Sequence, residues 1–425
     1  MDKTKIAFIL GGVFLVGLIL LVVIFGVRRN GPAELSGTLT LWGVFDDPAV
    51  MNEIINDYKR LRPRAQIVYQ QINAANYESD LINQLATPQS PDLFMFHNSW
   101  LPKHFDKLWP LTDSQLSLSS FRGIFPTVVE QDFAPDGVIY ALPLYLDTLA
   151  MFYNKDIFDT KGIAVPPTTW TEFQEMVKKV RELDRTGRPQ KAAAAIGGSN
   201  KSVNRGSDIL NLLMLQTGIK MVEDDFSRAS FAREGIDPLN FYTQFSNPRN
   251  EFYTWSESLP YSIDSFAEGQ TAVIFNYAHQ VAILKEKNPF LNFAIAAMPQ
   301  PSDAKTAVNI ANYWGLAVSA KSPNPALAWD FILYLTANSD VSRKYLQLTG
   351  KPPALRTLIP SYNNQELGIF AKQALTARSW PQIDNVIVDN AFSKAIEETI
   401  SGRLTAPQAL QQAEDTISNL MTKRR

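Results

Sequence analysis

The segment "GVIYALPLYLDTLAMFYNKDIF" (residues 137–158) is the most strand-like part of this sequence, and yet it contains an aspartate. Apolar residues dominate from Ile139 to Phe152, which is typical of a buried strand. Asp147 lies in the middle of that run, among tyrosines at positions 140, 145 and 153. Because a buried carboxylate without partners is costly, the fold has to place Asp147 beside water, a ligand or hydrogen-bond donors.

Helical and strand-like segments alternate on both sides of this stretch. Asp47 and Pro48 are suited to cap and begin a helix that runs to Leu61. Strands are expected at residues 38–42, 66–72, 91–96, 271–277, 292–299 and 313–319, with helical segments between many of them. Such alternation favours an α/β fold with a mostly parallel sheet and helices on both of its faces.

Length and composition limit the class of protein. At 425 residues, the chain is expected to hold two or three domains. Its 40 basic and 42 acidic residues are nearly balanced and form no basic stripe, so we expect no nucleic-acid partner. The sequence has no cysteine, which excludes disulfides, cysteine-ligated zinc, thiol catalysis and a cysteine-linked lipid.

The N-terminal segment is apolar enough to cross a membrane. The 22 residues from Ile6 to Val27 carry no charge, and a helix of that length spans a hydrocarbon core of about 30 Å. A cleaved signal peptide is the alternative, although its apolar region would usually be about 7–15 residues long and would not be followed directly by Arg28 and Arg29. We expect a single-pass transmembrane anchor over residues 1–30 and a linker over residues 31–37, which tether a soluble body to the membrane.

A series of segments carries a family resemblance through its order and spacing. The segments are "PDLFMFHNSW", "GVIYALPLYLDTLAMFYNKDIF", "PPTTWTEF", "FAEGQTAVIFNY", "AAMPQP", "YWGLAVSAKSPNPALAWDFILYL" and "SGRLTAPQALQQAEDTI". Together, over about residues 36–422, they resemble the family 1 extracellular solute-binding proteins of ABC importers, the group that includes maltose-binding protein. Many family members have a cleaved signal or a lipidated cysteine, and neither is recognised here. The resemblance implies a body on the extracytoplasmic side of the cell membrane, with the anchor in place of the lipid.

The resemblance also implies a fold and a place for Asp147. The family has the type II periplasmic-binding-protein fold, in which two α/β lobes are joined by three chain crossings. One lobe would comprise residues 36–145 and 298–335, and the other residues 146–297 and 336–425. Asp147 would lie at the first crossing, on the floor of the cleft, and its carboxylate would accept hydrogen bonds from ligand hydroxyls. The alternative is that Asp147 caps a local turn or pairs with an arginine.

Residues that directly follow the predicted strands are further candidates for ligand contacts, since ligands gather at the carboxyl ends of strands in open α/β sheets. Asp46 is preferred to Asp47, because a helix cap already explains Asp47. Gly315 would permit a ligand or a backbone to approach closely. A surface ion pair is the alternative for Arg356, and core packing is the alternative for each aromatic residue. The candidates are Trp42, Asp46, Asn98, Trp100, Asp147, Asn276, Tyr277, Trp314, Gly315, Arg356 and Trp380.

These residue types suit a carbohydrate. The apolar face of a pyranose ring packs on tryptophan or tyrosine, and its hydroxyls bond to aspartate, asparagine and arginine. With the resemblance, this predicts a membrane-anchored solute-binding protein that captures a mono- or oligosaccharide in the cleft and delivers it to ABC permease subunits, without a cofactor. Hinge closure of the lobes around the ligand would accompany binding.

Two other functional classes stay open from the sequence. A tethered sensor or adhesion module would use the same fold, because a fold does not fix a physiological role. A glycan hydrolase would need paired carboxylates, for which Asp132 with Asp136, or Asp46 with Asp47, could be imagined. The motifs GxSxG and HExxH and a Walker loop are absent, and the three histidines lack metal-ligand spacing. We therefore expect neither an enzyme nor a metal site.

Overall fold

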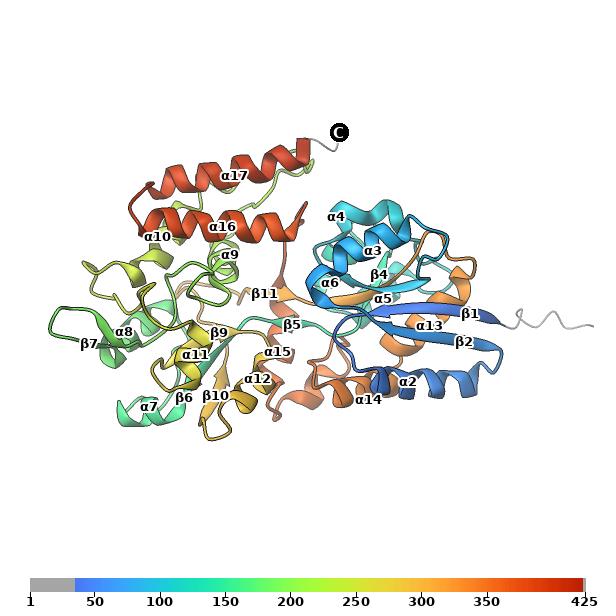
Figure 1. The fold of residues 1–425 in the computed structure, drawn as a ribbon, viewed down its shortest axis with the longest axis horizontal. Helices are drawn as coiled ribbons and strands as arrows, with labels where there is room; N and C mark the ends of the chain where they lie inside the picture. The colour runs from blue at the N-terminus through green and yellow to red at the C-terminus, as the bar shows by residue number, and fades with distance from the viewer. Residues whose placement is uncertain (1–34, 423–425) are drawn as a thin grey trace, which may run out of the picture.

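Two α/β lobes lie side by side along the long axis of the molecule (Figure 1). The structure, a computed structural model, describes residues 35–422. The predicted transmembrane anchor at residues 1–30 lies outside these described residues. Among residues 35–422, no helix combines the length and the apolar character that crossing a membrane requires.

The first lobe is built on a five-stranded sheet in the order β2–β1–β3–β12–β4. β1 runs parallel to β2 and β3, whereas β12 runs antiparallel to β3 and β4. The strands are β1 (Gly37–Gly43), β2 (Ala65–Gln71), β3 (Leu93–His97), β4 (Ala141–Pro143) and β12 (Trp314–Val318). The helices are α2 (Pro48–Leu61), α3 (Tyr77–Leu85), α4 (Leu101–His104), α5 (Leu118–Ile124), α6 (Thr127–Phe133), α13 (Pro325–Thr336) and α14 (Ser339–Thr349). The predicted strands of this lobe are confirmed, and so is the start of α2, where the Asp47 carboxylate accepts a hydrogen bond of 2.7 Å from the backbone N–H of Ala49.

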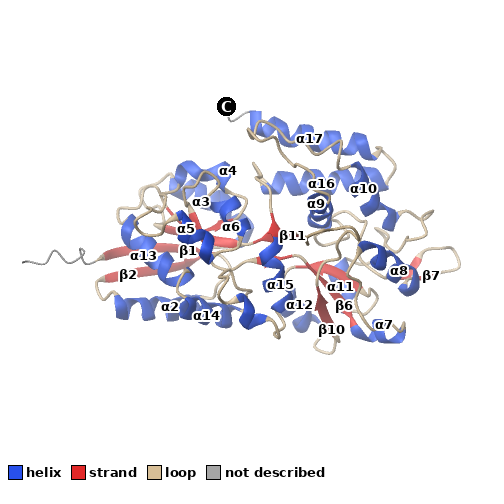
Figure 2. Cartoon of the chain, turned by 180° about the vertical axis from the view of Figure 1, so that it is seen from behind, coloured by secondary structure: helices blue, strands red, loops and turns tan. Residues whose placement is uncertain are grey.

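The second lobe has a smaller sheet in the order β10–β6–β9, with the central strand antiparallel to both neighbours. Its strands are β6 (Ala150–Asn154), β9 (Val273–Asn276) and β10 (Phe293–Ala296), and a separate ribbon pairs β7 (Glu182–Leu183) with β8 (Pro189–Lys191). The helices are α7 (Lys155–Thr160), α8 (Trp170–Val180), α9 (Gly206–Gln216), α10 (Ile236–Thr243), α11 (Ser262–Ala267), α12 (Gln280–Lys287), α16 (Asn385–Ile400) and α17 (Ala406–Thr422). Figure 2 shows helices around the strands of both lobes.

The prediction of a mostly parallel sheet is wrong for the second lobe. A parallel pair needs a crossover connection, usually one helix between the two strands. Here the chain enters β6 directly from the region between the lobes, and several helices separate β6 from β9. No single crossover unit sets the strand direction, and the predicted strand segments at 271–277 and 292–299 form antiparallel neighbours of β6.

A third sheet joins the lobes and contains all three chain crossings. It consists of β13 (Ala377–Arg378), β11 (Asn309–Asn312) and β5 (Asp147–Thr148), in that order, with α15 (Gly368–Gln373) beside it (Figure 1). Along the chain, Leu146 is the last residue of this stretch to pack in the first-lobe core, and Leu149 is the first to pack in the second-lobe core. The chain returns later, because Ile310 packs in the second core and Ala311 in the first. The residues of this hinge sheet therefore lie where the chain passes from one core to the other.

The positions of two expected lobe boundaries differ from those in the structure. Met298 packs in the second core, so the second crossing comes later than residue 298. At the other boundary, α14 packs on the first core through Tyr345 and Leu346, although residues 336–425 were expected in the second lobe. Only Ala337 and Asn338 separate α13 from α14, and so short a connection keeps the two helices together.

Candidate functional site

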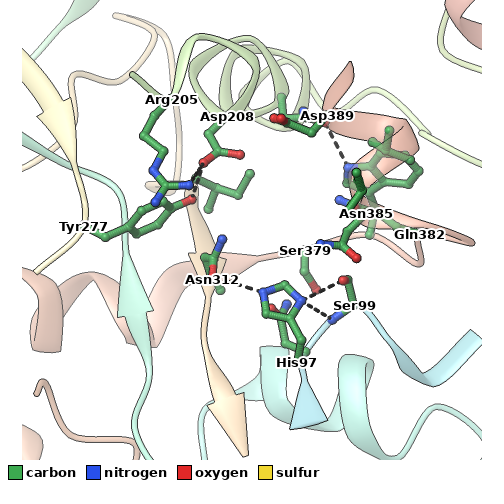
Figure 3. Close-up of a pocket in the computed structure, with 17 residues that line it drawn as sticks. His97, Ser99, Arg205, Asp208, Tyr277, Asn312, Ser379, Gln382, Asn385 and Asp389 are labelled. Atoms are coloured by element: carbon green, nitrogen blue, oxygen red, sulfur yellow. Dashed lines mark hydrogen bonds and ion pairs between the residues drawn. The ribbon is translucent and has the colours of Figure 1, made fainter. Parts of the chain in front are cut away.

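A polar cavity of about 230 Å³ lies between the lobes, next to the hinge sheet (Figure 3). The first lobe contributes the residues at and after the end of β3, and the hinge sheet contributes β11 and the residues after β13. The second lobe contributes the start of α9, the residue after β9 and the start of α16. The polar and aromatic wall residues are His97, Asn98, Ser99, Arg205, Asp208, Asn211, Tyr277, Asn312, Ser379, Trp380, Gln382, Asn385 and Asp389.

The start of α9 brings a cation, a carboxylate and an aromatic ring together. The guanidinium of Arg205 lies over the ring of Tyr277, 5.2 Å from its centroid. The Tyr277 hydroxyl donates to Asp208 Oδ2 at 3.1 Å, and Arg205 Nη1 is 3.9 Å from the same oxygen. The Arg205 Nε atom is buried and has no hydrogen-bond partner in the structure. This guanidinium therefore has donor capacity left for a ligand.

The carboxylates of the wall differ in how fully they are paired. Burial raises the pKa of Asp208 to about 6; Arg205 opposes this shift and the nearby carboxylate of Asp389 adds to it. Asp389 accepts hydrogen bonds from the Asn200 amide at 3.0 Å and from the Ser207 hydroxyl. Within residues 35–422, no group of three or more histidines and carboxylates is arranged to hold a metal ion.

His97 is held in a neutral state on the first-lobe side. Its Nδ1 accepts a hydrogen bond of 3.3 Å from the backbone N–H of Ser99, and its Nε2 then donates to Asn312 Oδ1 at 3.1 Å. Burial lowers the pKa of His97 to about 4. At neutral pH this side of the cavity therefore presents hydrogen-bonding groups without a charge.

Asp132 links the first lobe to the hinge segment after β13, beside the cavity. It accepts hydrogen bonds from Asn98 Nδ2 at 3.0 Å and from the Tyr313 hydroxyl at 2.8 Å. Its other oxygen accepts from the hydroxyl of Ser379, which directly follows β13. Burial raises the pKa of Asp132 to about 6. Of the imagined catalytic pair, Asp132 is buried in this network, whereas Asp136 is exposed.

Asp147 braces the hinge and does not line the cavity. Its carboxylate is buried and accepts hydrogen bonds from the backbone N–H groups of Thr148 at 2.8 Å and of Ala278 at 2.9 Å. Burial raises its pKa to about 8, although both hydrogen bonds act in the opposite direction. The aspartate in the strand-like segment is thus satisfied by backbone donors, and it fixes the loop that presents Tyr277.

Three of the candidate residues line the cavity, namely Asn98, Tyr277 and Trp380. Trp380 lies at the cavity edge, where its Nε1 donates to Asn211 Oδ1 at 3.0 Å. Asn276 lies behind the wall, buried, and its Nδ2 donates to Asn204 Oδ1 at 2.9 Å.

The other three candidate tryptophans, Trp42, Trp100 and Trp314, do not line the cavity. Trp100 and Trp314 meet edge to face with ring centroids 5.1 Å apart, and both contact the ring of His97. The Nε1 atom of Trp100 reaches across the cleft to Asn385 Oδ1 at 3.1 Å. Trp42 Nε1 donates to Gln70 Oε1 at 2.8 Å, on the neighbouring strand. Trp100 and Trp314 thus pack behind the wall residue His97, whereas Trp42 contacts the neighbouring strand.

Asp46, Gly315 and Arg356 also have roles within the first lobe. Asp46 is buried, pairs with Lys351 and accepts from the Tyr345 hydroxyl at 3.0 Å. A Cβ atom at Gly315 would lie 2.5 Å from the carbonyl oxygen of Leu142, so the glycine allows two strands to approach.

For Arg356, Nε donates to the carbonyl oxygen of Phe125 at 2.7 Å, which ties the segment after α14 to the end of α5. None of these three residues lines the cavity.

The candidates from the sequence follow strand ends and do not include the cavity residues near the N-terminal ends of α9 and α16. Asp208, Asn385 and Asp389 lie in the first turns of these helices, and Arg205 and Gln382 lie just before them. For α9 one signal was present: Asp208 precedes the apolar run of a predicted helix, where a charged residue faces away from the core. For α16 no pattern distinguished these residues from an ordinary exposed helix start.

Known proteins share this architecture. A probable ABC transporter-binding protein of Deinococcus radiodurans is 22% identical over 340 residues, covering 74% of this chain and 78% of its own. A multiple sugar-binding protein of Streptococcus mutans is 20% identical over 348 residues, 78% of each chain. The solved structure of the sugar-binding protein MalE from Xanthomonas citri superposes with a TM-score of 0.78 at 20% identity, covering 92% of this chain and 98% of that one.

The match to a protein family covers most of the chain. The sequence pattern of the bacterial extracellular solute-binding proteins matches residues 42–341, which include the first lobe's sheet, the hinge strands β5 and β11 and the start of α9. The two-lobed α/β fold predicted from the sequence is confirmed by the structure and by its likeness to MalE. This chain belongs to the family of bacterial extracellular solute-binding proteins.

Proposed function

We propose that this protein captures a small carbohydrate in the polar cavity and delivers it to the permease of an ABC importer. The observation that carries the proposal is the wall made by Arg205, Asp208 and Tyr277 at the junction of two lobes. A sugar hydroxyl both donates and accepts, so it can bond to a carboxylate and to a guanidinium at the same time. The ring of Trp380, which also lines the cavity, supplies an aromatic surface for a pyranose face.

The comparisons support the carbohydrate class. The relative in Streptococcus mutans is named a multiple sugar-binding protein, and the Xanthomonas citri structure is that of a sugar-binding protein. The cavity of about 230 Å³ is smaller than the 300–1,000 Å³ typical of drug-sized ligands. We therefore propose that the group held there is of the size of one sugar ring.

Closure and delivery follow from the placement of the wall. Residues from both lobes surround the cavity, so a bound ligand contacts both and stabilises the closed arrangement. Hinge closure around ligands is the known behaviour of periplasmic binding proteins. We propose that the closed form with bound ligand docks on permease subunits. We also propose that residues 1–30 anchor the protein in the cell membrane, with the body on the extracytoplasmic side.

Calorimetric titration with a panel of mono- and disaccharides tests this function. We expect at least one member to bind with a Kd below about 1 mM, and Arg205→Gln to weaken it at least tenfold by removing the charged donors. Arg249→Gln is the matched control, because Arg249 is exposed and lies outside the cavity. If no sugar in the panel binds, the carbohydrate proposal is wrong.

A further inference from the structure

A second cavity of about 740 Å³ lies between the lobes, on the far side of Trp380 from the polar cavity. Its first-lobe wall includes Leu101 and Phe105, and its second-lobe wall includes Ile219 and Phe226. The two cavities share one layer of residues, which are Asn98, Ser99, Ser379 and Trp380. The cleft is therefore divided into two adjoining compartments of different size.

Helix α9 runs along both compartments and changes character on the way. Arg205, Asp208 and Asn211 line the polar cavity, whereas Leu215 and Ile219 line the large one. The first four of these positions are three or four residues apart and share one face of α9, and Ile219 follows in the turn after the helix. At 1.5 Å per residue, the distance from Arg205 to Leu215 along the axis is about 15 Å. One continuous strip of the cleft thus passes from charged to apolar.

The large compartment suits an apolar group without negative charge. Apolar side chains form most of its wall, and exposed Phe105 shows 56% of its surface. The charged residues that line it are mainly acidic, with Asp132, Asp136, Glu223 and Asp224 against Lys220. Lys220 is already paired with Asp224 at 2.7 Å. The carboxylates of this compartment would therefore repel an anionic group.

Backbone strain marks both compartments. Within residues 35–422, the non-glycine residues with positive φ are Arg205, at +67°, and Phe226, at +53°. The first lines the polar cavity and the second lines the large one. Such conformations cost energy in residues with a Cβ atom and cluster at ligand sites.

From these observations we infer that the ligand is amphipathic, with a polyhydroxylated head in the polar cavity and an uncharged apolar tail along Leu215, Ile219 and Phe226. The chemical class is a glycoside whose aglycone is apolar, as opposed to a chain of sugar rings. This inference rests on the proposed carbohydrate binding. The shared layer, which includes Trp380, separates head from tail, and a ligand that spans both compartments crosses this layer.

Calorimetry with paired probes tests the inference. The probes are the methyl and phenyl β-D-glycosides of glucose, galactose and mannose, together with the 4-carboxyphenyl glycosides. We expect the phenyl glycoside of the recognised sugar to bind at least tenfold more tightly than the methyl glycoside, and the carboxyphenyl form to lose that gain. In Phe105→Ser and Phe226→Ser, the ratio of phenyl to methyl affinity should fall towards one. Phe290→Ser is the control, since Phe290 is 93% exposed and lies outside both cavities.

The outcomes separate the inference from the function on which it rests. Equal affinity for phenyl and methyl glycosides overturns the apolar tail and leaves sugar binding intact. The apolar tail is also overturned if a disaccharide binds more tightly than the phenyl glycoside, because the large compartment then takes a second sugar ring. If no glycoside binds, with or without an aglycone, both proposals fall. A gain that persists in both phenylalanine variants places the tail elsewhere and contradicts the inference.

Discussion

At the scale of single residues, Asp147 makes the stability of the protein depend on pH. The pKa of Asp147 is about 8 in the folded protein against 3.8 for an ordinary aspartate, so between these values the folded state binds more protons than the unfolded state. Stability contributed by Asp147 is then fully present below about pH 4 and is lost as pH rises through 8. Asp147→Asn keeps one acceptor oxygen and removes the titration.

We therefore expect the unfolding free energy of Asp147→Asn, relative to the unsubstituted protein, to increase by at least ~1 kcal/mol between pH 5 and pH 8. Urea unfolding at each pH unit in that range measures this difference. Contributions of the other titrating groups cancel, because both proteins contain them. Asp113→Asn, the same substitution at an exposed position, is the control. Parallel pH profiles for Asp147→Asn and the unsubstituted protein would show that Asp147 ionises normally in the fold.

Gly315 was expected near a ligand, but its surroundings predict an effect on stability. An added Cβ atom would lie 2.5 Å from the Leu142 carbonyl oxygen and 2.8 Å from the Phe133 ring. We expect Gly315→Ala to lower the unfolding free energy by about 1–3 kcal/mol through overpacking. Gly123→Ala is the control, because Gly123 lies in α5 with no atom within 4 Å of the added carbon, and alanine favours a helix. An unchanged denaturation midpoint in Gly315→Ala would contradict the close packing of β12 on β4.

Sequence alone predicted part of the site at this scale. The rule that ligands gather at strand ends found Asn98 and Tyr277, which lie in or beside such ends. The same rule failed for Asp46, because its partner Lys351 is 305 residues away and no local pattern reveals the pair. Arg205 and Asp208 could not be identified from the sequence, because charged residues at the start of a helix usually lie on an exposed surface.

At the scale of elements, the alternation of strands and helices predicted the two layered lobes, since periodic apolar patterns report burial directly. The direction of β6 relative to β9 and β10 could not be predicted, because it depends on how the chain enters the sheet from the hinge. The position of α14 followed from a two-residue connection to α13. The length of that connection can be read from the sequence only if the end of α13 and the start of α14 are both known.

The start of α16 is held to the first lobe by an ion pair. Asp384 caps this helix through the backbone N–H of Ile387 at 3.1 Å, and its other oxygen lies 2.5 Å from Lys103 Nζ. Lys103 also pairs with Glu78 at 2.7 Å. The contact joins α4 of the first lobe to α16 of the second across the cleft, so it stabilises the closed arrangement and contributes nothing within either lobe alone.

We expect Lys103→Met to weaken sugar binding several-fold, or by about 1 kcal/mol, because a partly buried charged hydrogen bond between the lobes is lost. The affinity should also depend less on salt than that of the unsubstituted protein. Lys344→Met is the matched control, since Lys344 pairs with Glu53 and Asp57 on α2, inside the first lobe. Titration calorimetry at low and high salt measures both effects. Equal losses of affinity in the two variants would exclude a specific role of the cross-lobe pair.

At the scale of the whole molecule, the division into two cores determines how the protein can move. Each core is continuous and closely packed, whereas the hinge sheet that joins them has strands of two to four residues. Bending is therefore expected at the hinge and not inside a lobe. Asp147 and Asp132 both lie at this junction, the first bonded to the loop after β9 and the second to the residue after β13.

Small-angle X-ray scattering can measure the motion directly. To shift the population from about 1% closed to about 99% closed, a ligand must bind the closed state about 10⁴-fold more tightly than the open state. We expect the radius of gyration of the body to fall at saturating sugar towards about 21 Å, the value for a compact chain of about 390 residues. Arg205→Gln, measured at the same sugar concentration, should keep the larger radius because it lacks the contact that links α9 to the ligand. A radius that stays constant while calorimetry shows full binding would mean that the lobes are rigid and that capture does not require closure.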